Sequence, residues 1–241
     1  MQRRTLLSAL APGVALGCLG LTAAPARAQT LGDKIVLGQS AAFSGPSAEL
    51  GQQYHLGAKL YFDRLNASGG IDGRKIELRK LDDGYEPERC AANTKQFISD
   101  GVFALFGYVG TPTTAAALPL ATEAKLPLFA PLTGAQSLRD PYNRQIVHVR
   151  ASYADETAAI VRQTVSMGIK RLAVFHQNDG YGQAGFEGTS RALATHKLEP
   201  VAVGTVERNS TDVATALAAI LPKNPEAIVQ VGTYKACAVF V

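Results

Sequence analysis

Short apolar runs rich in β-branched residues alternate along this chain with longer stretches in which apolar residues recur at every third or fourth position. Side chains alternate between the two faces of a strand and repeat about every 3.6 residues around a helix, so the short runs predict strands and the longer stretches predict amphipathic helices. In the first cycle, the run Ile35–Gly38 precedes a helix whose apolar face holds Tyr54, Ala58 and Leu65. This alternation favours a parallel sheet that helices cover on both faces.

The alternation divides into two successive blocks that meet near Arg150. In the first block we expect strands at 35–38, 76–81, 102–106, 128–130 and 146–149, and helices at 54–65, 87–98 and 113–125. In the second block we expect helices at 155–167, 183–196 and 213–221, and strands at 172–176, 201–206 and 228–232. The two blocks predict two Rossmann-like α/β lobes, at 29–150 and 151–241. No closing element is expected at 236–241, so the second lobe is expected to be incomplete.

Residues 1–28 have the pattern of an export signal. Arg3 and Arg4 precede an apolar stretch, and an A-x-A cleavage pattern ends at Ala28. A membrane anchor is the alternative, but a spanning helix needs ~20 predominantly apolar residues, and prolines and glycines interrupt a shorter run here. We therefore expect a periplasmic protein that begins at Gln29 after export by the twin-arginine or the general secretory route.

The charges of the chain give no indication of nucleic-acid binding. The sequence has 24 Lys and Arg against 20 Asp and Glu, and most of this excess leaves with Arg3, Arg4 and Arg27 of the expected signal. The remaining charges are interspersed without a basic run, which is typical of an ordinary solvated surface. Cys90 and Cys237 are far apart in the sequence and lack metal-ligand spacing, so we expect two isolated buried thiols, with a disulfide as the alternative that an oxidising compartment permits.

Sequence motifs of several enzyme classes are absent. The chain has no G-x-S-x-G elbow, no G-x-x-x-x-G-K-[ST] phosphate loop and no G-x-G-x-x-G after its first predicted strand. Its four histidines lack the spacing of metal ligands. Asp82 and Asp83 are expected to end a turn through hydrogen bonds from the backbone rather than to act as paired acids. We therefore expect no catalysis, no cofactor and no metal site.

Four segments in a consistent order carry a family pattern: Gln39–Pro46, Asn66–Leu78, Asp82–Asp83 and Asp179–Gly182. Together they resemble the periplasmic leucine/isoleucine/valine-binding protein family, and the resemblance extends from about Lys34 to the last residue. It implies the type I periplasmic binding protein fold, in which two lobes close on an amino acid or a related carboxylate. It also implies a monomer that serves as the substrate-binding component of an ABC importer and delivers its ligand to an inner-membrane permease. Members of this family are longer, which implies that this chain is C-terminally truncated.

A carboxylate ligand needs hydrogen-bond donors, which the N-terminus of a helix supplies together with a partial positive charge. The loop 107–114 leaves a predicted strand and enters a predicted helix, so Thr111 and Thr113 are candidate carboxylate donors. For either threonine the alternative is a capping role within the helix. The resemblance implies a ligand-contacting hydroxyl at Thr111.

The loop 129–135 leaves the next predicted strand at the same edge of the sheet. The resemblance implies that Pro131 or Leu132 offers a backbone carbonyl, and Thr133 a hydroxyl, to the ammonium group of an amino acid. The alternative is a turn with no ligand role. The family's acidic partner of the ammonium group would lie beyond Val241.

The resemblance places Ser44 and Leu50 at the mouth of the cleft, with Leu50 where some family members have an aromatic ring. Tyr181 and Tyr234 follow strands of the second block and are expected to close over the ligand, with core packing as the alternative. Two other functional classes stay open at this point. One is a periplasmic enzyme on the same architecture, because a fold does not fix a function. The other is a truncated fragment that binds nothing.

Overall fold

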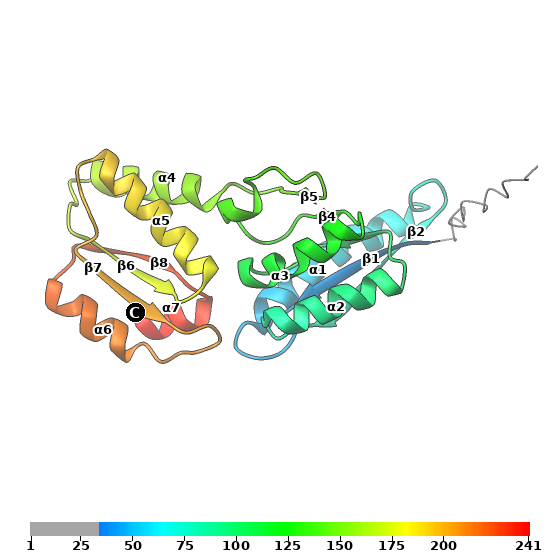
Figure 1. Ribbon diagram of the computed structural model, residues 1–241, viewed down its shortest axis with the longest axis horizontal. Helices are drawn as coiled ribbons and strands as arrows, with labels where there is room; N and C mark the ends of the chain where they lie inside the picture. The colour runs from blue at the N-terminus through cyan, green and yellow to red at the C-terminus, as the bar shows by residue number, and fades with distance from the viewer. Residues whose placement is uncertain (1–33) are drawn as a thin grey trace, which may run out of the picture. The chain divides into compact units, whose positions relative to one another are not determined.

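The computed structural model describes residues 34–241, and the expected export signal lies outside that range. Two parallel sheets carry the fold (Figure 1). The strands of the first sheet lie in the order β2-β1-β3-β4-β5, and those of the second lie in the order β7-β6-β8. The predicted α/β fold with two Rossmann-like lobes is thereby confirmed.

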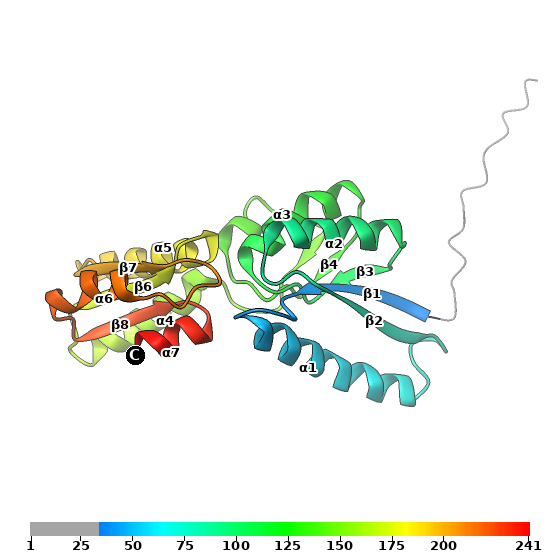
Figure 2. The same ribbon diagram turned by 90° about the horizontal axis from the view of Figure 1, so that it is seen from below.

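The first sheet and its helices come from the first half of the described chain. Its strands are β1 (Lys34–Ala41), β2 (Lys75–Asp82), β3 (Ala104–Phe106), β4 (Leu128–Phe129) and β5 (Ile146–Val147). Its helices are α1 (Ala48–Ala67), α2 (Pro87–Ser99) and α3 (Thr111–Glu123), followed by the short 3-10 turn η1 (Gln136–Leu138). Figure 2 shows α1 on one face of the sheet and α2 with α3 on the other.

The second sheet follows the same plan. Its strands are β6 (Leu172–Gln177), β7 (Ala202–Val206) and β8 (Ala227–Val231). Its helices are α4 (Tyr153–Ser166), α5 (Gly180–Thr195), α6 (Ala214–Ile220) and α7 (Tyr234–Phe240), with the 3-10 turn η2 (Leu221–Lys223) after α6. Helices α4 and α5 lie on one face of the sheet, and α6 and α7 lie on the other (Figure 1).

The central strand of the second sheet is buried because helices cover both of its faces. In β6 every residue is buried. Leu172 packs with Val161 of α4, whereas Phe175 packs with Phe240 of α7 on the opposite face. In the first lobe, Leu105 and Leu128 are fully buried, and burying such a side chain contributes about 1.5–3 kcal/mol.

Most predicted elements are present within a few residues of the expected bounds, and the second lobe is incomplete as predicted, but the sequence analysis predicted no helix where α7 lies. This helix has seven residues, too few for a helical repeat to stand out from the sequence. Cys90 and Cys237 are free thiols, as predicted, with Cys90 buried as expected but Cys237 only half-buried. Within residues 34–241, no helix is both long and apolar enough to span a membrane.

Candidate functional site

A cavity of about 410 Å³ is lined by residues of both sheets' loops and helices. Volumes of roughly 300–1,000 Å³ are typical of small-molecule sites. The first lobe and the junction between the lobes contribute Leu50, Tyr85, Val109, Gly110, Leu132 and Arg150. The second lobe contributes Tyr153, Tyr181, Gly232, Thr233, Tyr234 and Cys237.

The floor of the cavity in the first lobe is built by two neighbouring loops that continue the pairing of β3 with β4. Val109 and Leu132 form an isolated parallel bridge. The Leu132 N–H donates to the Tyr108 carbonyl at 2.7 Å, and the Gly110 N–H donates to the Leu132 carbonyl at 3.3 Å. Carboxyl ends of parallel strands meet at one sheet edge, which is where ligands bind in open α/β sheets. These bonds therefore fix both loops as a rigid extension of the sheet.

Two of the predicted site residues, Thr111 and Thr133, contact each other next to these loops. The hydroxyl oxygens of Thr111 and Thr133 lie 2.6 Å apart, and both side chains are buried. The Thr133 oxygen also accepts from the Ala135 N–H at 3.2 Å. A bond between two hydroxyls uses only one of their two protons. The second proton therefore remains for an acceptor close to the first turn of α3.

The Tyr85 ring reaches the cavity because residue 110 has no side chain. Gly110 has a φ of 104°, and a Cβ there would lie 2.2 Å from Cε2 of Tyr85. Tyr85 itself has a φ of 66° and is 2% exposed. Tyr85 was not predicted from the sequence. It follows the carboxyl end of β2, directly after the turn Asp82–Gly84, and the carboxyl ends of parallel strands are where ligands bind.

An aromatic wall comes from the starts of α4 and α5. The rings of Tyr153 and Tyr181 have centroids 5.3 Å apart. The Asp179 side chain accepts from the N–H groups of Tyr181 and Gly182 and so caps α5, which orients Tyr181. Burial and the neighbouring Tyr153 raise the pKa of Tyr181. Its hydroxyl therefore stays neutral and acts as a hydrogen-bonding group.

Arg150 is the one charged side chain among the described residues that line the cavity. Its guanidinium lies 5.2 Å from the centre of the Tyr153 ring and pairs with the Glu156 carboxylate. Burial lowers the pKa of Arg150, but the hydrogen bond and the charge of Glu156, together with Tyr153 and Tyr181, outweigh this effect, so that the net shift is upward. In the sequence, Arg150 was identified only as the place where the two blocks meet. A positively charged residue at the junction of two lobes was the available signal for a ligand-site role.

The structure brings five of the eight predicted site residues to this region. Leu132, Tyr181 and Tyr234 line the cavity, as does Leu50. Thr111 and Thr133 do not line it, but each directly follows a lining residue, Gly110 or Leu132, in the sequence. The Tyr234 hydroxyl donates to the Pro46 carbonyl at 2.9 Å and so joins the second lobe to the first.

The other three predicted residues do not line the cavity. Ser44 is exposed, and its hydroxyl donates to Asp82. Thr113 is buried and donates to the Val109 carbonyl at 2.6 Å, just before α3, and α3 has no side-chain cap, so neither the donor role nor the capping alternative is seen for Thr113. Pro131 is buried, and its carbonyl accepts from the Thr133 N–H at 2.9 Å.

The acidic pair after β2 organises the turn, as predicted. Asp82 accepts from the N–H groups of Phe43, Ser44 and Gly84. Burial raises its pKa, but these bonds together with those from the Ser44 hydroxyl and Arg89 leave it well below its ordinary value. Asp83 accepts from the Tyr85 N–H at 2.8 Å, which fixes the backbone that carries Tyr85.

The whole described chain is similar to known proteins. Residues 34–241 match the model of a family described as "Periplasmic binding protein". The Leu/Ile/Val-binding protein of Escherichia coli K12 is 25% identical over 178 residues, which cover 73% of this chain and 47% of that protein. The chain spans about half the length of the curated relatives it matches.

Two solved structures share both the fold and part of the sequence. A possible leucine/isoleucine/valine-binding protein from Rhodopirellula baltica is 39% identical, with a TM-score of 0.82 over 86% of this chain and 57% of that chain. A substrate-binding periplasmic protein from Ralstonia solanacearum is 33% identical, with a TM-score of 0.82 over 86% of this chain and 59% of that chain.

Proposed function

The chain belongs to the periplasmic binding protein family, and on that premise we propose that it captures a branched-chain or related amino acid between its two lobes. The observation that carries this proposal is the cavity of about 410 Å³ whose lining comes from both lobes. Such a site buries a small ligand when two lobes close around it. The binding-protein names of the relatives support a binding role rather than catalysis.

The carboxylate of the ligand is proposed to bind at the start of α3. The first-turn N–H groups of a helix have no partner within the helix and favour an anion. The Thr111–Thr133 hydroxyl pair, with its one unused proton, lies at the same end of α3. Arg150 adds a positive charge to the cavity lining. These groups together supply the donors that a carboxylate requires.

The side chain of the ligand is proposed to lie against the apolar part of the lining. Leu50, Val109 and Leu132 offer aliphatic surface, which suits leucine, isoleucine or valine. A second candidate ligand is an aromatic carboxylate. It is favoured by one specific observation, the combination of Arg150 with four tyrosine side chains in the lining.

The proposal for the complete protein is the substrate-binding component of an ABC importer. It would act in the periplasm as a monomer and deliver its ligand to an inner-membrane permease. The family match and the names of the relatives support this role.

Isothermal titration of the purified chain against leucine, isoleucine, valine and benzoate tests the function. We expect saturable binding of at least one amino acid with one ligand per chain, and the ligand should be recovered unchanged. Conversion of the ligand would instead favour a periplasmic enzyme, and absence of any binding heat would favour a fragment that binds nothing.

A further inference from the structure

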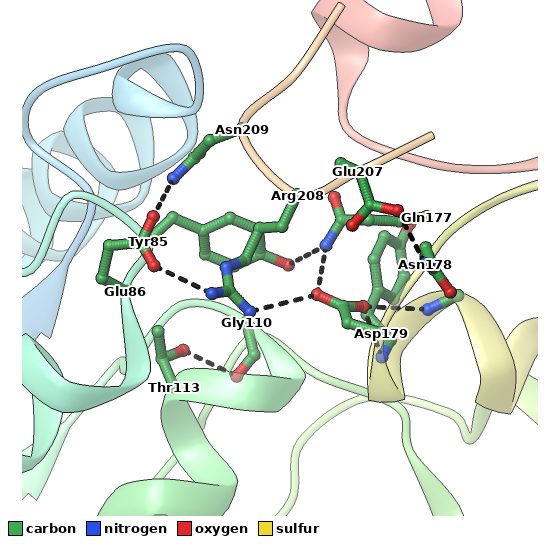
Figure 3. Close-up of polar contacts among 12 residues, drawn as sticks. Tyr85, Glu86, Gly110, Thr113, Gln177, Asn178, Asp179, Glu207, Arg208 and Asn209 are labelled. Carbon is green, nitrogen blue, oxygen red and sulfur yellow. Dashed lines mark hydrogen bonds and ion pairs between the residues drawn. The ribbon is translucent and has the colours of Figure 1, made fainter. Parts of the chain in front are cut away.

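Polar contacts between the two lobes gather on the loop that joins β7 to α6. Arg208 donates from Nη2 to Oε2 of Glu86 at 2.8 Å. Asn209 donates from Nδ2 to the other Glu86 oxygen at 2.7 Å (Figure 3). The same Nδ2 donates to the Gly84 carbonyl at 2.9 Å. We call Glu86, Arg208 and Asn209 the inter-lobe polar cluster. One carboxylate of the first lobe thus binds two successive side chains of the second.

The second lobe holds Arg208 ready for this contact. Nη1 of Arg208 lies 3.8 Å from Oδ2 of Asp179, so the guanidinium lies between one carboxylate of each lobe (Figure 3). Asp179 is itself fixed, because it caps α5 and accepts from Gln177 at 2.6 Å. A cation with a prepared geometry loses less conformational freedom on pairing than a free surface side chain does.

The backbone of the loop is also set for the contact. Asn209 has a φ of 61°, a left-handed conformation that asparagine tolerates better than most residues. Such a conformation persists where surrounding contacts determine it. Here Asn209 has three inter-lobe partners, since Ser47 also donates to its Oδ1 at 3.4 Å.

None of the three cluster residues lines the cavity, but Glu86 and Asp179, the second-lobe partner of Arg208, each lie close in the sequence to a residue that does. Glu86 directly follows the lining residue Tyr85, and Asp179 begins the turn that carries Tyr181. Gln177 further approaches the Tyr85 hydroxyl at 3.4 Å. The cluster therefore responds to closure of the lobes without touching a ligand in the cavity.

We propose that the inter-lobe polar cluster of Glu86, Arg208 and Asn209 holds the lobes closed and thereby sets how long a ligand stays bound. All of its inter-lobe bonds must break when the lobes separate, whereas a ligand approaching the open form meets none of them. A contact present only in the closed state raises the closed population and slows release. Its three members are positioning residues.

Stopped-flow displacement of bound L-leucine measures the first consequence. Arg208→Ala and Glu86→Gln should each raise the dissociation rate constant about five- to thirty-fold and should not lower the association rate constant, since the ligand enters the open form. The double variant should release the ligand no faster than the faster single variant, because both changes remove the same Arg208–Glu86 ion pair. The matched control is Glu207→Gln in the same loop, since Glu207 pairs with Asn178 of its own lobe. Arg208→Lys should recover part of the slow release.

Small-angle X-ray scattering of the ligand-free chain gives a readout that does not depend on the ligand. Arg208→Ala and Glu86→Gln should increase the radius of gyration, and 1 M NaCl should do the same for the wild type by screening the pair. Glu207→Gln should match the wild type. The kinetic arm rests on the proposed function, so a wild type that does not bind L-leucine contradicts the ligand class, while scattering still decides the closure role. Unchanged scattering in folded Arg208→Ala and Glu86→Gln, or additive effects in the double variant, overturns the proposal.

Discussion

At the scale of single residues, the Thr111–Thr133 pair lies directly behind the cavity lining, because each threonine follows a lining residue in the sequence. Two buried hydroxyls 2.6 Å apart share one hydrogen bond, while the nearby Thr113 hydroxyl donates to the Val109 carbonyl just before α3. Thr111 and Thr113, two positions apart in the sequence, thus have different hydrogen-bond partners. The Thr111–Thr133 pair keeps one hydroxyl proton that these contacts do not use.

Replacing Thr111 by valine should weaken ligand binding. The change keeps the shape of the side chain but removes a hydroxyl, and an unsatisfied buried partner costs about 1–3 kcal/mol. Isothermal titration with the ligand found for the wild type measures the loss. Thr113→Val is the matched control, because that hydroxyl donates to the Val109 carbonyl; it should lower thermal stability more than affinity. Equal affinities of wild type and Thr111→Val would remove Thr111 from the site.

Asp83 makes the stability of the chain depend on pH. Burial raises its pKa to about 6 from an ordinary 3.8, although hydrogen bonds from Ser40 and the Tyr85 N–H act in the opposite direction. Between these values the folded chain keeps a proton that the unfolded chain has released, so the free energy of unfolding falls as pH rises, by about 2–3 kcal/mol. Above pH 6 the penalty is constant.

Urea unfolding of wild type and Asp83→Asn between pH 4.5 and 7.5 isolates this effect. The asparagine keeps an oxygen for the Tyr85 N–H but cannot ionise. The difference in unfolding free energy should shift in favour of the variant as pH rises to about 6 and then level off. A difference that is flat across the whole range would mean that Asp83 titrates near its ordinary pKa when folded.

At the next level, the turns that connect strands to helices hold the site in shape. The turn after β3 depends on Gly110, whose positive φ and missing Cβ admit the Tyr85 ring. The start of α4 depends on a capping box between Ser152 and Asp155. It places Tyr153 next to the turn that holds Thr133, since the Tyr153 N–H donates to the Gly134 carbonyl at 2.7 Å.

A methyl group at residue 110 should damage both stability and binding. Gly110→Ala forces an alanine into φ 104° and against Tyr85, and strain of this kind costs about 1–3 kcal/mol. Gly57→Ala within α1 is the control, because nothing lies within 4 Å of a Cβ there and alanine favours a helix by about 1 kcal/mol. Urea unfolding should rank the control above the wild type and Gly110→Ala below it. A Gly110→Ala chain as stable as wild type would contradict the role of this turn.

Removing the cap of α4 should cost about 1 kcal/mol. Ser152→Ala deletes the oxygen that accepts from the Asp155 N–H at 3.1 Å. Ser166→Ala near the other end of the same helix is the control, because its hydroxyl is exposed and bonds only to the Gln163 carbonyl among the described residues. Thermal unfolding should lower the midpoint for Ser152→Ala alone, and equal midpoints for the two variants would argue against the cap.

Across the whole molecule, the sequence predicts what is local and misses what folding brings together. The order of strands and helices was predictable because each long element repeats its own apolar period. The pairing of Thr111 with Thr133 was predictable because both follow parallel strands at one sheet edge. The sequence did not predict the cavity residues Tyr85, Arg150 and Tyr153. They meet only in the folded chain, because they come from the loop after β2, the junction between the lobes and the start of α4. Helix α7 was missed because it is short.

We propose that one small carboxylate contacts both lobes in the same cavity. An NMR titration of the isotope-labelled chain with L-leucine, and in parallel with benzoate, tests it most directly. The account predicts that backbone amides of Val109 and Gly110 in the first lobe and of Gly232 and Thr233 in the second shift together with one dissociation constant. Shifts confined to one lobe, or none at saturating ligand, would contradict it.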